Sequence, residues 1–152
     1  MKRGFKSIFV IALLIVGLVG CGSTTQSGNS GLGTAVKSTD EQIREIYVGL
    51  IKDINNSDFS EARSKLSALN QLCEDNDISE TDRKSAKCVY FYAGGIYKLL
   101  AAGIGVSGLQ HPELMIIENN MQGYANGGQL SEPDKTLELA EQFFNAVNKE
   151  VK

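Results

Sequence analysis

The chain has 152 residues, in which 15 lysines and arginines stand against 18 aspartates and glutamates, for a net charge of −3. This length suits a single domain with one hydrophobic core. The acidic balance argues against nucleic acid as a partner, because a nucleic-acid-binding protein needs a concentrated basic face to neutralise phosphates.

The first 20 residues have the layout of an export signal. A basic start precedes an apolar run from Ile8 to Val19. This run is shorter than the roughly 20 apolar residues that a membrane-spanning helix needs. Removal of residues 1–20 leaves 12 basic and 18 acidic residues, so the remaining chain has a net charge of −6. The basic residues of the removed segment are Lys2, Arg3 and Lys6.

The sequence Leu18-Val19-Gly20-Cys21 at the end of this run resembles the lipobox of bacterial lipoprotein precursors. The resemblance implies cleavage before Cys21, a covalent lipid on Cys21 and anchoring in the bacterial cell envelope, at a membrane outside the cytoplasm. If the source has two membranes, the outer one is favoured, because Gly22 and Ser23 lack the acidic residue that resembles an inner-membrane retention signal. The alternative is an ordinary secretory signal followed by an unrelated cysteine.

Residues 22–39 consist mainly of Gly, Ser, Thr, Gln and Asn, with a single charge at Lys37. This composition predicts a flexible tether with a root-mean-square reach of about 23 Å. We therefore divide the chain into a signal peptide over residues 1–20, the lipidated cysteine and tether over residues 21–39, and a single helical domain over residues 40–152.

Two amphipathic helices are predicted at the start of the domain. Ser38 with Glu41 three residues later is a capping pattern that starts the first helix, which ends near residues 55–56. The second follows from about residue 57 and carries Glu61 and Lys65 at the spacing of an ion pair. The inward residues, at steps of three and four, are Ile43, Ile46, Tyr47, Leu50, Ile51 and Ile54 in the first helix and Phe59, Ala62, Leu66, Leu69 and Cys73 in the second.

Residues 74–85 form a polar segment that is rich in carboxylates. An EF-hand calcium loop counted from Asp75 would need glycine at the sixth position and glutamate at the twelfth. The chain has Glu80 and Ala86 there. We therefore interpret the segment as a solvated turn, in which Ser79 or Thr81 caps the helix that follows.

Residues 88–109 are the most apolar stretch of the domain, with Lys98 as the only charge. The stretch is long enough to span a bilayer, but a lysine in its middle is costly in lipid, so we expect a central helix surrounded by the others. Its glycines and alanines would let neighbouring helices approach closely. Residues 103–108 match the dinucleotide motif G-x-G-x-x-G, which requires a strand before it and a helix directly after it. We interpret them instead as a glycine-rich end of the central helix, near Val106.

Two more helices are predicted after this segment. Pro112 suits the first turn of the fourth helix, and Ser131 with Pro133 starts a fifth that runs to the end of the chain. His111 is the only histidine, so no histidine-rich metal site is predicted, and we expect His111 on the surface. The inward residues are Leu114, Ile117, Met121 and Tyr124 in the fourth helix and Leu137, Ala140, Phe144, Val147 and Val151 in the fifth.

The inward residues of the second and fifth helices recur at the same intervals. Their pattern of alanine, three residues, a large residue, two residues and a second large residue resembles the second helix of a tetratricopeptide repeat. The resemblance implies stacked helix pairs. An antiparallel bundle would produce the same intervals.

Cys73 and Cys88 are the two cysteines that remain beside Cys21. Outside the cytoplasm such a pair tends to oxidise, and the loop of about 15 residues that a disulfide would close corresponds to ~3 kcal/mol. The bond requires the central helix to begin late, near residues 82–87, because the two Cα atoms must lie within about 7 Å of each other. The alternative is a pair of buried free thiols.

The sequence thus predicts an all-α domain of about five helices, as an antiparallel bundle or stacked helix pairs around a central apolar helix. We expect a membrane-anchored cell-envelope lipoprotein whose helical scaffold binds an envelope protein or helps an envelope complex assemble. We do not expect an enzyme, a metal site or a cofactor other than the lipid on Cys21, because no cluster of titratable residues has catalytic spacing. The alternative is a lipid or other small hydrophobic ligand in the helical core, with Tyr90, Tyr92 and Tyr97 as polar groups of its pocket.

Overall fold

The computed structural model describes residues 37–106 and 112–151, and within these ranges it contains five α-helices and no strand. The all-α prediction is therefore confirmed. No helix of the described ranges is long and apolar enough to cross a membrane. The helices are α1 (Thr39–Asn55), α2 (Phe59–Glu74), α3 (Glu80–Ala101), α4 (Pro112–Ala125) and α5 (Pro133–Glu150).

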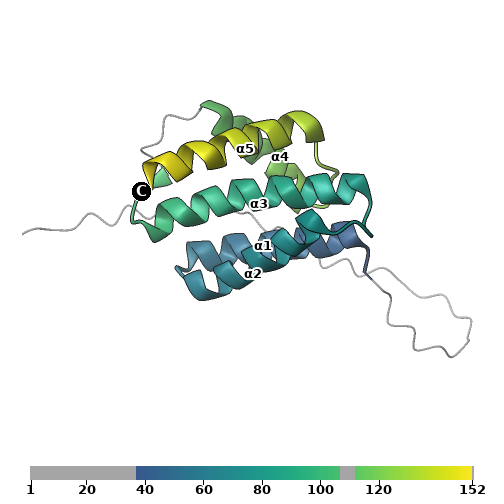
Figure 1. Ribbon diagram of the computed structural model, residues 1–152, viewed down its shortest axis with the longest axis horizontal. Coiled ribbons are helices and arrows are strands. Elements are labelled where there is room, and N and C mark those ends of the chain that lie inside the picture. Colours follow the sequence, from purple (N-terminus) through teal and green to yellow (C-terminus); the bar gives the residue numbers. More distant parts are fainter. Residues whose placement is uncertain (1–36, 107–111, 152) are drawn as a thin grey trace, which may run out of the picture. The chain divides into compact units, whose positions relative to one another are not determined.

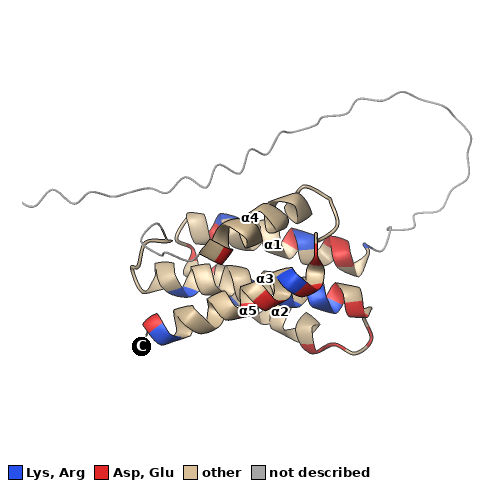
Figure 2. Cartoon of the chain, turned by 90° about the horizontal axis from the view of Figure 1, so that it is seen from above, with Lys and Arg blue, Asp and Glu red and all other residues tan. Residues whose placement is uncertain are grey.

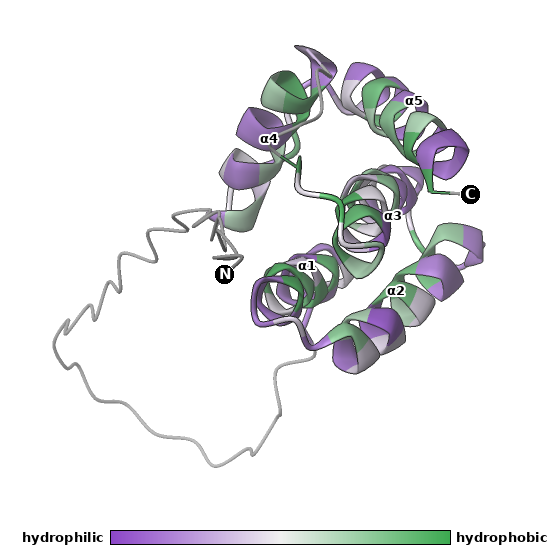
Figure 3. Cartoon of the chain, turned by 90° about the vertical axis from the view of Figure 1, so that its left-hand side faces the viewer, coloured by the Kyte–Doolittle hydropathy of each residue, from purple (hydrophilic) through white to green (hydrophobic). Residues whose placement is uncertain are grey.

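Helix α3 is the centre of the bundle. It packs against α1, α2 and α5, while α1 also packs against α2 and α4, and α4 packs against α5 (Figure 1). Figure 3 looks along the helices and shows α3 in the middle, with α1 and α2 on one side and α4 and α5 on the other. The predicted central helix is thus present, and it provides ten of the buried residues of the domain.

Helix α1 follows the sequence pattern closely. The Ser38 hydroxyl accepts a hydrogen bond from the backbone N–H of Glu41 at 3.2 Å, which satisfies one of the free amides at the helix start. The last residue is Asn55, as predicted. Ile46 is only partly buried, whereas the other predicted inward residues are in the core: Ile43, Tyr47, Leu50, Ile51 and Ile54.

Lys65 of α2 forms its ion pair with α1 rather than within its own helix. Its Nζ lies 2.6 Å from Oδ2 of Asp53, so the predicted pairing with Glu61 is wrong. The side chain crosses above Gly49, where a Cβ would lie 3.0 Å from the Lys65 Cε. A glycine on α1 thus leaves room for the lysine stem to reach the neighbouring helix.

Helix α3 begins earlier and ends earlier than predicted. Ser79 caps it by accepting a hydrogen bond from the N–H of Asp82 at 3.0 Å. The helix ends at Ala101, and Gly103 then adopts a φ of +73°. Two backbone bonds close a Schellman motif there, from Ile104 N–H to the Leu99 carbonyl at 2.9 Å and from Gly103 N–H to the Leu100 carbonyl at 3.0 Å. The glycine-rich helix end is confirmed for residues 103–106, and residues 107–111, with His111, lie outside the described ranges.

The backbones of α3 and α5 come close at Gly94 and Gly95. A Cβ on Gly95 would lie 2.5 Å from Cε1 of Phe143, so the ring occupies the space that any side chain would need. A Cβ on Gly94 would lie 3.2 Å from Cε2 of Phe144. The expectation that small residues of α3 allow close helix packing is therefore confirmed at these two positions.

Helix α5 differs from the sequence prediction at its start and in its orientation. Its N-cap is Glu132 in the left-handed region, at φ 43°, without a side-chain cap, so the predicted cap at Ser131 is wrong, whereas the predicted early proline is confirmed, since the helix begins at Pro133. The buried residues are Thr136, Ala140, Phe143 and Val147, whereas Phe144 is only half-buried. Ala140 and Val147 are inward as predicted, but the predicted inward position of Phe144 is wrong, because Phe143 and not Phe144 meets Gly95.

A polar cluster joins α1 to α4. The Arg44 guanidinium donates to the Tyr124 carbonyl at 2.9 Å and lies 5.1 Å from the centre of the Tyr124 ring. The Tyr124 hydroxyl donates to Oδ1 of Asp40 at 2.9 Å, and Arg44 also pairs with Asp40. Burial raises the pKa of Tyr124, so its hydroxyl remains a donor at neutral pH. The cluster fixes the residues that directly follow the predicted tether.

Candidate functional site

The candidate site is the outer side of α3, between α2 and α5. These two helices pack on α3 from either side and are not among the closely packed helix pairs (Figures 1 and 3). The part of α3 between them is therefore not covered by either helix, and two pockets make it a recessed surface. We call this surface the α3 face and define it by Arg83, Lys84, Lys87, Tyr90, Phe91 and Lys98.

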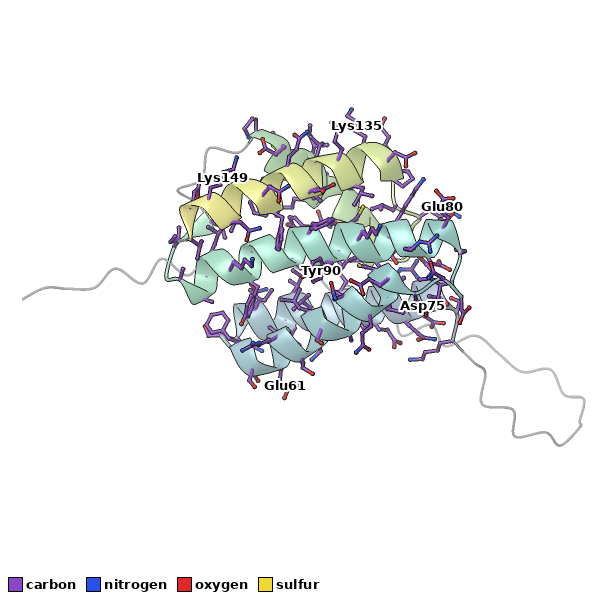
Figure 4. The ribbon with its side chains drawn as sticks, in the orientation of Figure 1. Glu61, Asp75, Glu80, Tyr90, Lys135 and Lys149 are labelled. Carbon is purple, nitrogen blue, oxygen red and sulfur yellow. The ribbon has the colours of Figure 1, made fainter. Side chains whose placement is uncertain are left out.

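Three aromatic rings form the middle of the α3 face. Tyr90 and Phe91 lie 5.6 Å apart, and the Phe144 ring of α5 lies 5.9 Å from Tyr90 and 5.4 Å from Phe91, measured between ring centres. These separations are typical of tilted and edge-to-face aromatic pairs. All three side chains are only half-buried, so they keep apolar surface available (Figure 4 labels Tyr90).

The inward residues of α2 and α5 recur at the same intervals, and one equivalent pair of them meets at the α3 face. Leu66 and Phe144 occupy equivalent positions of the two patterns, and both approach Gly94. A Cβ on Gly94 would lie 3.6 Å from Leu66 Cδ2 and 3.2 Å from Phe144 Cε2. Equivalent residues of two helices thus meet over one glycine of α3 and divide the α3 face into two halves.

A polar pocket of about 460 Å³ opens at the half nearest the start of α3. Arg83 donates to the side-chain oxygen of Asn76 at 3.2 Å, and Lys84 pairs with Asp134 of α5 at 2.8 Å. Figure 2 shows that charged residues gather toward this end of the bundle, where α1 and α3 begin. The lining residues are Cys73, Glu74, Asn76, Glu80, Arg83, Lys84, Lys87 and Leu137.

A second pocket, of about 360 Å³, lies at the other half, between the ends of α3 and α5. Lys98 Nζ lies 4.4 Å from the centre of the Phe144 ring and donates to the Asn148 side chain. This cation–π contact holds the ammonium beside the aromatic cluster. Tyr97, Ala101, Ala102 and Val151 line the rest of the pocket.

The three tyrosines predicted for a ligand pocket do not meet around one cavity. Tyr92 is 4 % exposed and packs between Tyr47 and Phe143, each at 6.5 Å between ring centres. Burial raises the pKa of Tyr92, as it does that of Tyr47. Tyr90 and Tyr97 are half-buried on the outer side of α3, where Tyr97 contacts Phe59. Neighbouring rings thus fill the space around Tyr92.

The predicted disulfide between Cys73 and Cys88 is not formed, since both cysteines are free and buried. The late start of the central helix on which it depended is wrong. Because α3 begins at Glu80, Cys88 lies about 12 Å along its axis. The Cys88 thiol instead donates a weak hydrogen bond to the Pro133 carbonyl at 3.8 Å. Burial raises the pKa of Cys73 to about 11 and that of Cys88 to about 12.

We expect both thiols to react slowly with iodoacetamide in the folded protein. The thiolate is the reactive form, and a raised pKa keeps both groups protonated at about pH 8. Alkylation of Cys73 and Cys88, followed by mass spectrometry, should be at least about tenfold slower than in the urea-unfolded protein and should accelerate with rising pH. Two cysteines that resist alkylation in urea until a reductant is added would contradict the free thiols.

The α3 face has a pattern in the sequence, but the apolar character of residues 88–109 conceals it. Lys87, Phe91 and Lys98 fall on one side of a helix, whereas the apolar stretch of residues 88–109 predicts a central helix surrounded on all sides. Cys21 lies outside the described residues. Within residues 37–106 and 112–151, no three His, Cys, Asp or Glu side chains are grouped to hold a metal ion.

Comparisons with protein families, curated proteins and solved structures found no match to this chain.

Proposed function

We propose that this protein is a bacterial cell-envelope lipoprotein, anchored by a lipid on Cys21, whose helical domain binds another envelope protein through the α3 face. The domain acts as a scaffold for protein–protein interaction or complex assembly and not as an enzyme. The lipobox-like sequence supports the anchor, and the tether of about 23 Å lets the domain reach a partner away from the headgroups.

The observation that carries the binding function is the aromatic cluster of Tyr90, Phe91 and Phe144. Aromatic residues are enriched in protein interfaces, where a ring supplies a large apolar area at a low cost in conformational entropy. The cluster lies between two pockets on a recessed surface, which offers a partner both apolar contact and places for side chains. A small ligand inside the core has no comparable support, because the buried Tyr92 is enclosed by Tyr47 and Phe143.

Photocrosslinking in the native host tests the binding function. The photoreactive amino acid p-benzoylphenylalanine replaces Tyr90 in the α3 face or, as a control, Lys135 on the outer side of α5 (Figure 4). Irradiation of intact cells should produce a discrete adduct with a second protein from position 90 and none from position 135. Absence of a protein adduct at position 90, or equal adducts at both positions, would contradict the proposal.

We expect Cys21→Ser to abolish membrane anchoring. Each buried methylene of a lipid chain contributes ~0.8 kcal/mol of membrane affinity, so loss of the lipid removes the anchor. Detergent phase partitioning should move the protein from the detergent phase to the aqueous phase, or leave a precursor of higher mass. Ser23→Ala is the control and should partition as the original chain does. Partitioning that Cys21→Ser leaves unchanged would refute the anchor.

A further inference from the structure

Four of the 12 basic residues of residues 21–152 lie on α3, more than on any other helix. From Arg83 to Ala101 the helix carries four lysines and arginines and no aspartate or glutamate, although residues 21–152 have 12 basic and 18 acidic residues in total. All four cations belong to the α3 face. A protein with a net negative charge thus presents a basic strip between two of its helices.

Most of these cations have no carboxylate partner among the described residues. Lys84 pairs with Asp134 and Glu80. Arg83 donates only to uncharged oxygens, namely the side chain of Asn76 and the backbone of Asp75. Lys98 donates to the Asn148 amide oxygen, and Lys87 forms no ion pair with a residue of 37–106 or 112–151. Glu74 and Glu80 line the same pocket as Arg83 and Lys84, so Lys87 and Lys98 are the cations that keep positive charge available for an outside group.

The distance between Lys87 and Lys98 along α3 matches the length of a short helix in a partner protein. Lys87 and Lys98 are 11 residues apart, which corresponds to about 16 Å or three helical turns. Tyr90 and Phe91 lie between them and are backed by Phe144. The order along the strip is therefore cation, aromatic cluster, cation. A partner helix of the same length would meet it with acidic residues near its ends and apolar residues in its middle turn.

The position of the strip favours a protein segment over a membrane surface. Helices α2 and α5 flank α3 (Figure 3), and all four cations line the two pockets of this surface, so they lie in a recess and not on a projecting face. A flat bilayer cannot follow this recess. Basic segments that bind anionic lipids also usually combine 4–8 exposed lysines and arginines, about twice the number that remain unpaired on the α3 face.

We propose that the α3 face binds an acidic amphipathic helix of the partner protein. Apolar side chains of that helix pack on Tyr90, Phe91 and Phe144, and its carboxylates lie near Lys87 and Lys98. This inference rests on the protein-binding function proposed above and specifies the chemistry of the partner. Charge complementarity of this kind raises the rate of association and fixes the register of the bound helix.

The test combines the photocrosslinker at position 90 with charge reversal. Lys87→Glu with Lys98→Glu should reduce the adduct by at least about tenfold, because two attractive contacts become repulsive. Lys52→Glu with Lys149→Glu makes the same change in net charge on α1 and the outer side of α5 and should leave the adduct unchanged (Figure 4 labels Lys149). The crosslinked partner peptide, identified by mass spectrometry, should be net negative with apolar residues at steps of three and four.

Several results would overturn the inference. The acidic helix is contradicted if the adduct persists with Lys87→Glu and Lys98→Glu, or if the crosslinked segment has no acidic residues. Neither result contradicts protein binding by the α3 face. An adduct with a second copy of this chain, or with lipid alone, assigns the α3 face to a dimer or a membrane. No protein adduct at all removes both proposals. Circular dichroism verifies that each variant folds, and Lys87→Gln with Lys98→Gln, which only neutralises the charges, should give an intermediate yield.

Discussion

Replacement of Phe143 with alanine should lower the free energy of unfolding by about 3–5 kcal/mol. Phe143 is fully buried, and its ring fills the space beside Gly95 and packs on Tyr92. Removal of the ring leaves a cavity between α3 and α5, which Gly95 cannot fill because it has no side chain. Urea unfolding followed by far-ultraviolet circular dichroism measures the loss.

Phe144→Ala is the matched control for this measurement. Phe144 is the adjacent residue and equally large, but it is only half-buried in the aromatic cluster of the α3 face. Its removal should therefore cost less, about 1–2 kcal/mol, in proportion to the smaller apolar area it buries. Equal losses for the two variants, or a larger loss for Phe144→Ala, would contradict the orientation of α5.

The orientation of α5 illustrates where sequence reasoning reached its limit. Intervals of three and four residues fit Leu137, Ala140 and Phe144 as well as the observed Thr136, Ala140 and Phe143. A helix buries only one of two consecutive phenylalanines at its contact line, and the pattern within α5 does not decide which. Gly95 on α3 determines which phenylalanine is buried, because the space left by its missing side chain accepts the Phe143 ring.

Helix α1 was predictable because its signals are local and agree with one another. The cap at Ser38, the apolar stripe and the polar end at Asn55 all lie within the helix. The start of α3 was missed for the opposite reason. Ser79 is a correct local signal for the helix start, whereas a disulfide between Cys73 and Cys88 is a long-range assumption that requires a later start.

The α3 face was only partly predictable. The sequence singles out Tyr90, but only together with Tyr92, because both lie in one apolar stretch. On a helix these two residues point to different sides, and only the positions of α2 and α5 show which side stays uncovered. The arrangement of neighbouring helices, which intervals along one helix do not specify, therefore determines the site.

Replacement of Gly95 with alanine should lower the free energy of unfolding by up to about 2 kcal/mol. The new Cβ would lie 2.5 Å from Cε1 of Phe143, and overpacking of this kind typically costs about 1–3 kcal/mol. Alanine is favoured over glycine in a helix by ~1 kcal/mol, which offsets part of the loss. The ring belongs to a fully buried side chain, so it cannot move aside freely.

Gly123→Ala separates the steric effect from helix propensity. A Cβ at Gly123 in α4 would meet no atom within 4 Å, so this variant should be more stable by about 0.5–1 kcal/mol. The double variant Gly95→Ala with Phe143→Leu should lose less stability than the two single losses added together, because a smaller side chain leaves room for the new methyl group. Strict additivity, or a Gly95→Ala variant as stable as Gly123→Ala, would show that the Phe143 ring does not press against Gly95, and the close contact of α3 with α5 would then need another cause.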